Sequence, residues 1–299
     1  MRITQSMLQN NMLKNLYSSQ AQMNKYLTQI NTGKKISRPS DDPVIVMKGM
    51  GYRTEVTEVD QYRRNTSEIW NWMDHTDDAL DKATKAMQRI EELAVQAAND
   101  TYDKDEREAI AKEVEQLQRQ LVEIANTNVN GKYIFNGTDT NLKPVEVDEE
   151  GNVIVTDTDG RNQYVNIEVS KGITFDVNMD PDKMFNKELF ANIDDFISAL
   201  KSDDSNQQDE MNSALENLRK GTTDIVNTRA ELGAKMNRLE LIEDRLSHQE
   251  IIAKDTMMKN EGVDFEEAVM NLLTQEVIHR AALSAGSKII QPSLVDFLR

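Results

Sequence analysis

Apolar residues recur at alternating steps of three and four over long stretches of this chain, and this spacing restricts the folds open to it. One such run extends from Met73 to Ala97, and a longer one from Met211 to Leu246. A repeat averaging 3.5 residues lines up along one narrow side of an α-helix, and that side packs against another helix. The pattern therefore predicts long helices joined through narrow apolar seams.

The order of these runs predicts how the helices pair. After a polar break at 99–105, the spacing returns at Ile110, Val114, Leu117, Leu121 and Ile124. Two helical segments separated by a short break are typical of an antiparallel hairpin. A helix from Asp209 to Met257 would be about 70 Å long, more than a compact domain of this size requires. We therefore predict a mainly α fold, an elongated antiparallel helical rod.

Composition agrees with this fold class and excludes several partners. Only 38% of the 299 residues are hydrophobic and 5% aromatic, and 12 Gly and 5 Pro leave few turns. The net charge of -17 argues against nucleic acid and anionic membrane surfaces as partners. The sequence shows no membrane-spanning run and no secretory signal, which by themselves predict a cytoplasmic protein. The absence of cysteine fits a reduced compartment, or equally a protein that crosses a barrier unfolded.

The period of the apolar pattern changes to two between the helical halves. Short strands are expected at 145–147, 153–155, 164–169 and 173–177, separated by glycine-containing turns. The segment 142–181 is therefore predicted to be a small inserted antiparallel β module.

The sequence offers little chemistry for catalysis or metal binding. Its three histidines lie far apart and lack partners at metal-ligand spacing: His75, His248 and His279. Asp157 and Asp159 resemble part of a calcium loop, but Val155 stands where the first acidic ligand belongs. A hairpin turn is the favoured interpretation there. We predict no catalytic residue, no cofactor and no metal site.

The two ends of the chain carry thinner apolar stripes. The residues of these stripes and of the apolar tail are Ile3, Met7, Leu16, Met23, Leu27, Ile30, Phe265, Val269, Leu272, Leu273, Val277, Ile289, Leu294, Phe297 and Leu298. A thin stripe can belong to a surface helix docked on its own domain, or to a seam that awaits another helix. The terminal position favours the second interpretation. We therefore predict that these residues form an assembly interface.

A short polar segment separates the first helix from the second. It reads Asn-Thr-Gly-Lys-Lys-Ile-Ser-Arg-Pro-Ser-Asp-Asp-Pro over residues 31–43. Gly33 can close a helix in the left-handed conformation, and Pro39 keeps the residue before it extended. Asp42 can cap a new helix that begins at Pro43. Asp41 and Asp42 could also act as an acid and a base, but adjacent acids before a proline favour capping.

This junction segment resembles the flagellin superfamily, and its Pro-Ser-Asp-Asp-Pro form is most similar to the hook-associated members of that superfamily. Further blocks that resemble the superfamily follow in chain order at 89–101, 124–137, 228–240, 275–290 and 294–298. The blocks cover both flanks of the chain, whereas the β module carries no motif of this kind.

The resemblance implies a structural subunit of the bacterial flagellum, located extracellularly where the hook-associated proteins meet the flagellin filament. It implies export through the flagellar type III channel without a cleaved signal. The implied partners are copies of the chain itself, the other hook-associated protein, flagellin and an export chaperone. Two alternatives are a minor flagellin, disfavoured by the Pro39 to Pro43 motif, and a cytoplasmic coiled-coil adaptor, which would leave the ordered blocks unexplained.

Together these expectations divide the chain into five segments. They are an N-terminal polymerisation helix (1–42), the ascending half of the helical rod (43–141), the β insert (142–181), the returning half of the rod (182–260) and a C-terminal polymerisation helix (261–299).

Overall fold

The structure is a computed structural model that describes residues 5–98, 103–148, 153–157, 160–202 and 207–290. The chain forms two compact units. Residues 1–58 and 249–299 make up one, which we name the terminal unit, and residues 59–248 make up the other, the body unit. The expected mainly α fold with inserted antiparallel strands is confirmed.

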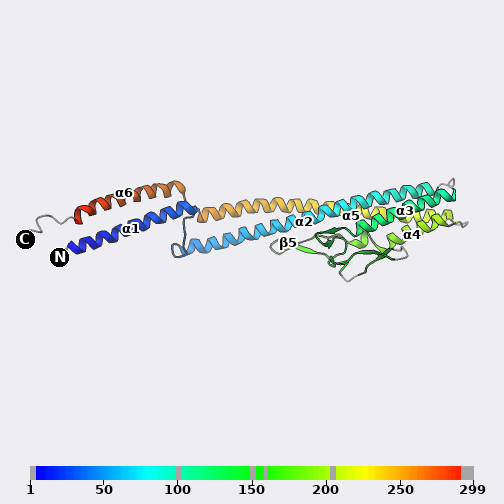
Figure 1. Ribbon diagram of the computed structural model, residues 1–299, viewed down its shortest axis with the longest axis horizontal. Helices are drawn as coiled ribbons and strands as arrows, with labels where there is room; N and C mark the ends of the chain where they lie inside the picture. The colour runs from blue at the N-terminus through cyan, green and yellow to red at the C-terminus, as the bar shows by residue number, and fades with distance from the viewer. Residues whose placement is uncertain (1–4, 99–102, 149–152, 158–159, 203–206, 291–299) are drawn as a thin grey trace, which may run out of the picture. The chain divides into compact units, whose positions relative to one another are not determined.

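Six helices account for most of the described residues (Figure 1). They are α1 (Gln5–Thr32), α2 (Pro43–Ala97), α3 (Lys104–Ala125), α4 (Lys187–Lys201), α5 (Gln207–Glu261) and α6 (Phe265–Ile290). The long helix predicted from Asp209 to Met257 is confirmed, since α2 and α5 each run for 55 residues. None of the described helices combines the length and the apolarity that a membrane span needs.

The core of the body unit lies between α2, α3, α4 and α5. The seam predicted on α2 is buried at every position: Met73, Thr76, Leu80, Ala83, Met87, Ile90, Ala94 and Ala97. On α3, Leu117 packs against the core but is only partly buried, while its neighbour Gln118, which was not predicted, is buried. The Gln118 amide donates to Asp194 of α4 at 2.7 Å, so a hydrogen bond to a second helix turns this polar residue inward.

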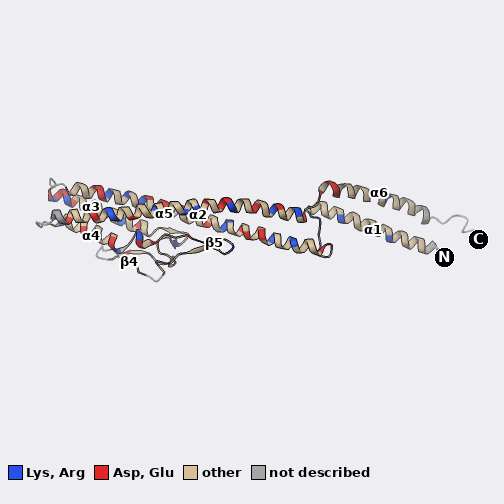
Figure 2. Ribbon diagram, turned by 180° about the vertical axis from the view of Figure 1, so that it is seen from behind, with Lys and Arg blue, Asp and Glu red and all other residues tan. Residues whose placement is uncertain are grey.

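Helices α2 and α5 pair antiparallel within the body unit. As the residue number increases along α2, the number of the contacted residue on α5 decreases. The polar contacts are Trp70 to Glu243, Asp77 to Arg229 and Glu91 to Arg219. Figure 2 shows acidic and basic residues interspersed along both helices. These exposed pairs each contribute little to stability, and the buried seam between them supplies most of it.

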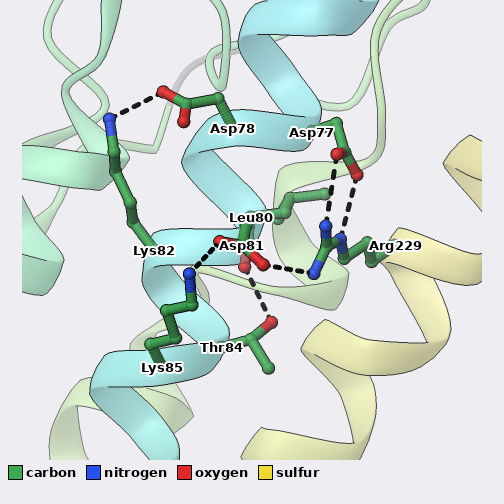
Figure 3. Close-up of polar contacts among 8 residues, drawn as sticks. All are labelled: Asp77, Asp78, Leu80, Asp81, Lys82, Thr84, Lys85 and Arg229. Carbon is green, nitrogen blue, oxygen red and sulfur yellow. Dashed lines mark hydrogen bonds and ion pairs between the residues drawn. The ribbon is translucent and has the colours of Figure 1, made fainter.

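Arg229 is the most connected of these cations (Figure 3). Its Nε donates to Asp77 at 2.9 Å, and its Nη1 donates to Asp81 at 2.6 Å. Hydrogen bonds from Lys85, and then from Arg229, hold the pKa of Asp81 below its ordinary value. One guanidinium therefore spans two carboxylates one turn apart, which aligns α5 on α2.

The described strands form three separate antiparallel pairs, of which the second and third lie in the insert. They are β1 (Asn128–Val129) with β2 (Lys132–Tyr133), β3 (Val145–Val147) with β4 (Val153–Val155), and β5 (Asn166–Ser170) with β6 (Ile173–Asp176). All four predicted strands are present. The pair β1 and β2 follows directly after α3, in a stretch that the sequence analysis assigned to the end of a helix.

The hairpin turn expected at Asp157 is not found. Strand β4 pairs with β3, and β5 pairs with β6, so the chain between β4 and β5 connects two hairpins. Asp157 forms an ion pair with Lys187 at 3.4 Å, and Asp159 lies outside the described residues. The pairing places Val145 opposite Val155, and both side chains are buried, so the apolar core selects this arrangement.

A buried arginine anchors the insert to the start of α4. Arg161 is 2% exposed, and its Nη2 donates to the carbonyl of Phe185 at 2.8 Å. Its Nε donates to Asp182 at 3.0 Å, and its Nη1 reaches the carbonyls of Pro144 and Thr156 at 3.4 Å. Four hydrogen bonds to three chain segments therefore meet on one guanidinium, to which the sequence analysis gave no role.

Candidate assembly surface

Helices α1 and α6 lie side by side in the terminal unit (Figure 1) and run antiparallel. At one end of the pair, Gly286 faces Met12 so closely that a Cβ on Gly286 would lie 1.5 Å from the Met12 methyl carbon. At the other end, Lys34 forms an antiparallel bridge with Gly262. The terminal unit therefore brings the first and last helices of the chain together.

The seam between α1 and α6 combines small and polar side chains with larger apolar ones that are only partly buried. The residues at least partly buried at heptad spacing are Gln9, Met12, Leu16, Ser19, Met23, Tyr26 and Ile30 on α1, with Ala268, Leu272, Gln275, His279, Ala282 and Gly286 on α6. Small residues let two helices approach closely but remove little apolar surface from water. This seam therefore stabilises the pair weakly.

Two buried polar atoms in this seam lack partners. Ser19 and His279 each lie seven residues from the contact of Met12 with Gly286, so both face the same seam. In the described part of the chain, the Ser19 Oγ and the His279 Nδ1 have no hydrogen-bond partner. Leaving such an atom unpaired costs about 1–3 kcal/mol.

Large apolar side chains point away from the seam. The outer apolar residues, as we name them, are Met7, Leu8, Leu13, Tyr17 and Leu27 on α1, with Phe265, Met270, Leu273, Val277, Ile278 and Leu283 on α6, and they are 40–68% exposed. Among the described residues of the terminal unit, the only buried hydrophobic residues are Ala253 and Ala268. Apolar surface of this extent is typical of an interaction site.

The structure divides the sequence-predicted assembly residues into two groups. Met7, Leu27, Phe265, Leu273 and Val277 are exposed, whereas Leu16, Met23, Ile30, Val269 and Leu272 are partly buried. Ile3, Leu294, Phe297 and Leu298 lie outside the described residues, and Ile289 lies in α6 with its side chain not described.

The sequence analysis treated the large apolar residues of α6 as one stripe, and the structure shows that most of them do not face α1. Small residues at heptad spacing take that place instead, because they allow the closer helix approach seen at Gly286. This seam could have been recognised in the sequence from the steps of three and four that lead from Leu272 through His279 to Gly286.

The junction between α1 and α2 is built as its residues predict. Gly33 has a φ of +66°, the left-handed conformation that ends α1. The Asp42 carboxylate accepts from the backbone N–H groups of Val44 at 2.9 Å and Ile45 at 3.1 Å, which confirms it as the cap of α2. Pro43 is the first residue of that helix.

Asp41 and Pro39 lie in the loop that leads to this cap. The Asp41 carboxylate accepts from the backbone N–H of Arg38 at 3.0 Å and that of Ser37 at 3.3 Å. Asp41 and Asp42 therefore each hold a separate turn of backbone, as the capping interpretation expects.

This junction also contacts the short break between α5 and α6. The Lys35 N–H donates to the Glu261 carbonyl at 2.7 Å, and the Val263 N–H donates to the Gly33 carbonyl at 3.1 Å. Two breaks more than 200 residues apart in the sequence are thereby joined. The sequence analysis located each break but not their pairing, because local signals carry no information about distant partners.

Glu261 is the charged centre of this contact. Its side chain is 12% exposed and pairs with Arg53 at 2.5 Å and with Lys34 at 3.5 Å. The hydrogen bond from Arg53, with a smaller contribution from Lys34, holds the pKa of Glu261 below its ordinary value. Gly49 leaves room for the carboxylate, since a Cβ there would lie 2.3 Å from the Glu261 Oε1.

Two family models match the helical flanks of the chain. The bacterial flagellin N-terminal helical region matches residues 3–140, and the bacterial flagellin C-terminal helical region matches residues 206–298. The segment between the two matches contains β3 to β6 and α4.

The similarity to individual relatives extends over nearly the whole chain. Flagellar hook-associated protein 3 of Escherichia coli is 28% identical over 302 residues, which cover 94% of each chain. A flagellin of Listeria innocua is 24% identical over 263 residues, which cover 87% of this chain and 85% of the flagellin.

The fold is likewise similar to that of a solved structure. The crystal structure of Xanthomonas campestris FlgL aligns with a TM-score of 0.60 at 18% identity, covering 68% of this chain and 98% of that chain. The flagellin-like helical fold that the sequence resemblance implied is therefore confirmed.

Proposed function

The chain belongs to the flagellin superfamily, and we propose that it is a structural subunit of the bacterial flagellum that joins the hook to the flagellin filament. The observation that carries the proposal is the similarity to hook-associated protein 3 over 94% of both chains. The flagellin match is lower in identity and in coverage. The role is structural, and no catalytic residue is part of it.

The terminal unit provides the means of assembly. Its outer apolar residues are exposed, and its seam holds unpaired polar atoms, so packing against further helices would bury surface that the single chain leaves in water. We assign this packing to the stripes of 3–31 and 264–290, together with Leu294, Phe297 and Leu298. The neighbours that supply the partner helices are copies of this chain, the other hook-associated protein and flagellin.

The location we propose is the extracellular flagellum, reached through the flagellar export channel. A chain without cysteine forms no disulfide that would obstruct passage in an unfolded state. Before export, the exposed apolar side chains of α6, such as Leu273 and Val277, need protection from aggregation. We assign that protection to an export chaperone that binds α6.

Immunogold labelling of intact cells tests the proposal. An epitope placed at Leu142, which is 52% exposed in the insert, leaves the terminal unit unchanged. A junction subunit gives one spot at the base of each filament. Label along the whole filament would instead identify a minor flagellin, and label confined to the cell interior would identify a cytoplasmic adaptor.

A further inference from the structure

A polar cleft of about 400 Å³ lies between the last turns of α1 and the loop that follows them. Three cations line it: Lys25 from α1, with Lys35 and Arg38 from the loop. Asn24, Thr28 and Ser37 add hydrogen-bonding groups to its walls. All of these residues belong to the terminal unit, so the cleft is formed within one compact part of the chain.

Hydrogen bonds hold the loop wall of this cleft in place. The buried Gln29 side chain donates from its Nε2 to the Lys35 carbonyl at 2.7 Å. The Asp41 carboxylate accepts from the Arg38 N–H at 3.0 Å, and the Lys35 N–H donates to Glu261 at 2.7 Å. The backbone that carries two of the three cations is therefore fixed before any ligand arrives, which reduces the entropy lost on binding.

The three cations have no anionic partner within the described chain. Neighbouring Lys34 and Arg53 both pair with Glu261, but the described residues include no ion pair for Lys25, Lys35 or Arg38. Like charges gathered around one cleft repel each other, and a bound anion relieves that repulsion.

One carboxylate, that of Asp41, also lines the cleft, but it accepts from the backbone N–H groups of Ser37 and Arg38 and forms no ion pair with the three cations in the described part of the chain. Residues 1–40 contain six basic residues and none of the 52 acidic residues of the chain. Figure 2 accordingly shows blue but no red on α1. Every acidic residue lies in 41–299, so the N-terminal segment and the remainder of the chain are opposite in charge.

We propose that the cleft binds carboxylates on an acidic helix surface of a second copy of this chain. The inference rests on the proposed function, in which copies pack against each other, and it adds a polar contact to their apolar packing. A copy carries the complementary charge, and Asn24, Thr28 and Ser37 can donate to the same carboxylates. The Asp41 carboxylate, which also lines the cleft, disfavours a polyanion with closely spaced charges, such as nucleic acid.

Charge reversal in the full chain tests the cleft. The variant carries Lys25→Glu together with Arg38→Glu, and the matched control carries Lys14→Glu with Lys48→Glu, four exposed residues in the same unit. Both variants should melt as the wild type does. The cleft variant should be found at about tenfold fewer hook–filament junctions by quantitative immunogold labelling, while the control stays at the wild-type level. Normal incorporation of the cleft variant, or an equal loss in the control, would overturn the proposal.

A photo-crosslinking amino acid at Thr28, on the cleft wall, identifies the occupant in isolated flagella. We expect its adduct to map to an acidic segment of another copy of this chain, which a mixture of isotope-labelled and unlabelled subunits distinguishes from a contact within one chain. An adduct on a different protein, or only within the same chain, would disprove the second copy as partner. If the wild-type chain gives no label at the filament base, the proposed function itself is wrong. If the wild type is labelled there and the cleft variant is incorporated equally well, only the proposed role of the cleft is wrong.

Discussion

The body unit and the terminal unit are both built on heptad spacing, yet they use it in opposite ways. In the body unit, large apolar residues such as Met73, Leu80 and Leu232 fill the seams and are fully buried. In the terminal unit, Gly286 and Ser19 lie in the seam, the larger seam residues such as Leu16 are only partly buried, and many large apolar residues are exposed. The same periodicity can therefore specify a core within one chain or leave an apolar surface for a neighbouring one.

The difference follows from how much apolar surface each seam removes from water. Burying a leucine or methionine side chain contributes about 1.5–3 kcal/mol, and the body unit does this many times over. The terminal seam fully buries only small and polar side chains, buries its larger apolar residues in part, and leaves two polar atoms unpaired within the described residues. We infer that the body unit folds by itself and that the terminal unit is completed by assembly.

The largest expected effect comes from placing a charge in each unit. Leu232→Asp puts an unpaired carboxylate in the fully buried core of the body unit and should lower its stability by about 3–5 kcal/mol. Leu273→Asp changes a residue that is 56% exposed, so the melting temperature of the purified chain should stay within about 2 °C of wild type. Differential scanning calorimetry measures both.

The same pair of variants separates folding from assembly. Cells that produce the Leu273→Asp chain should release unpolymerised flagellin and swim poorly, since a charge would enter the surface that assembly buries. If Leu273→Asp melts as early as Leu232→Asp, α6 belongs to a core of the single chain, and the contrast between the units is wrong.

Hydrogen exchange of a verified monomer measures the contrast without mutation. We expect amides of α1 and α6 to exchange about 100-fold faster than those of α2 between Met73 and Ala97, corresponding to roughly 3 kcal/mol in opening free energy. The physical reason is the weak terminal seam. Equal protection in both regions would contradict the assignment of the terminal unit as incomplete.

A smaller effect is expected from the buried arginine of the insert. Arg161→Met removes donors to Phe185 and Asp182 and leaves buried carbonyls unpaired, which should destabilise the body unit by about 2–3 kcal/mol. Limited proteolysis should then cleave the insert sooner than in wild type. Arg238→Met is the control, because the exposed Arg238 only stacks over Phe175 and should change stability by less than about 1 kcal/mol. If Arg161→Met and Arg238→Met lower the stability equally, Arg161 is not the anchor of the insert.

The smallest effect concerns acidity in the terminal unit. The pKa of Glu261 lies below its ordinary value of 4.5, chiefly through the hydrogen bond from Arg53. A lowered carboxylate pKa stabilises the folded state above about pH 4.5, and this contribution is lost as the pH falls through the folded-state pKa. It should amount to less than about 1 kcal/mol, because Arg53 and Lys34 are half exposed.

Exchange of the Lys35 amide, which donates to the Glu261 carbonyl, reports this loss as the pH is lowered. In Glu261→Gln the Lys35 amide should exchange faster at neutral pH, and the opening free energy should not change on acidification once the intrinsic rate is corrected. If the opening free energy of the wild-type Lys35 amide stays constant from pH 6 down to the folded-state pKa of Glu261, the ion pairs do not hold the junction.

Local chemistry determined much of the architecture. The end of α1 and the start of α2 were predicted from Gly33, Asp42 and Pro43. These signals are local, because a left-handed glycine, a capping carboxylate and a proline without an N–H each affect only the backbone within a few residues. The steps of three and four predicted α2 and α5, and the steps of two predicted β3 to β6. The flagellin resemblance likewise rested on contiguous blocks that the sequence displays directly.

Only the tertiary structure decided which partner each surface meets. The pairing of β4 with β3, the packing of Met12 on Gly286 and the four contacts of Arg161 all join residues from separate elements. So does the contact of Glu261 with Lys34, which joins two breaks in the helices. A periodic pattern shows that one side of a helix is apolar. Whether that side packs within the chain or against a neighbouring chain depends on which arrangement buries more apolar surface. In α6, small and polar residues together with Leu272 face α1, and most of the large apolar residues remain exposed.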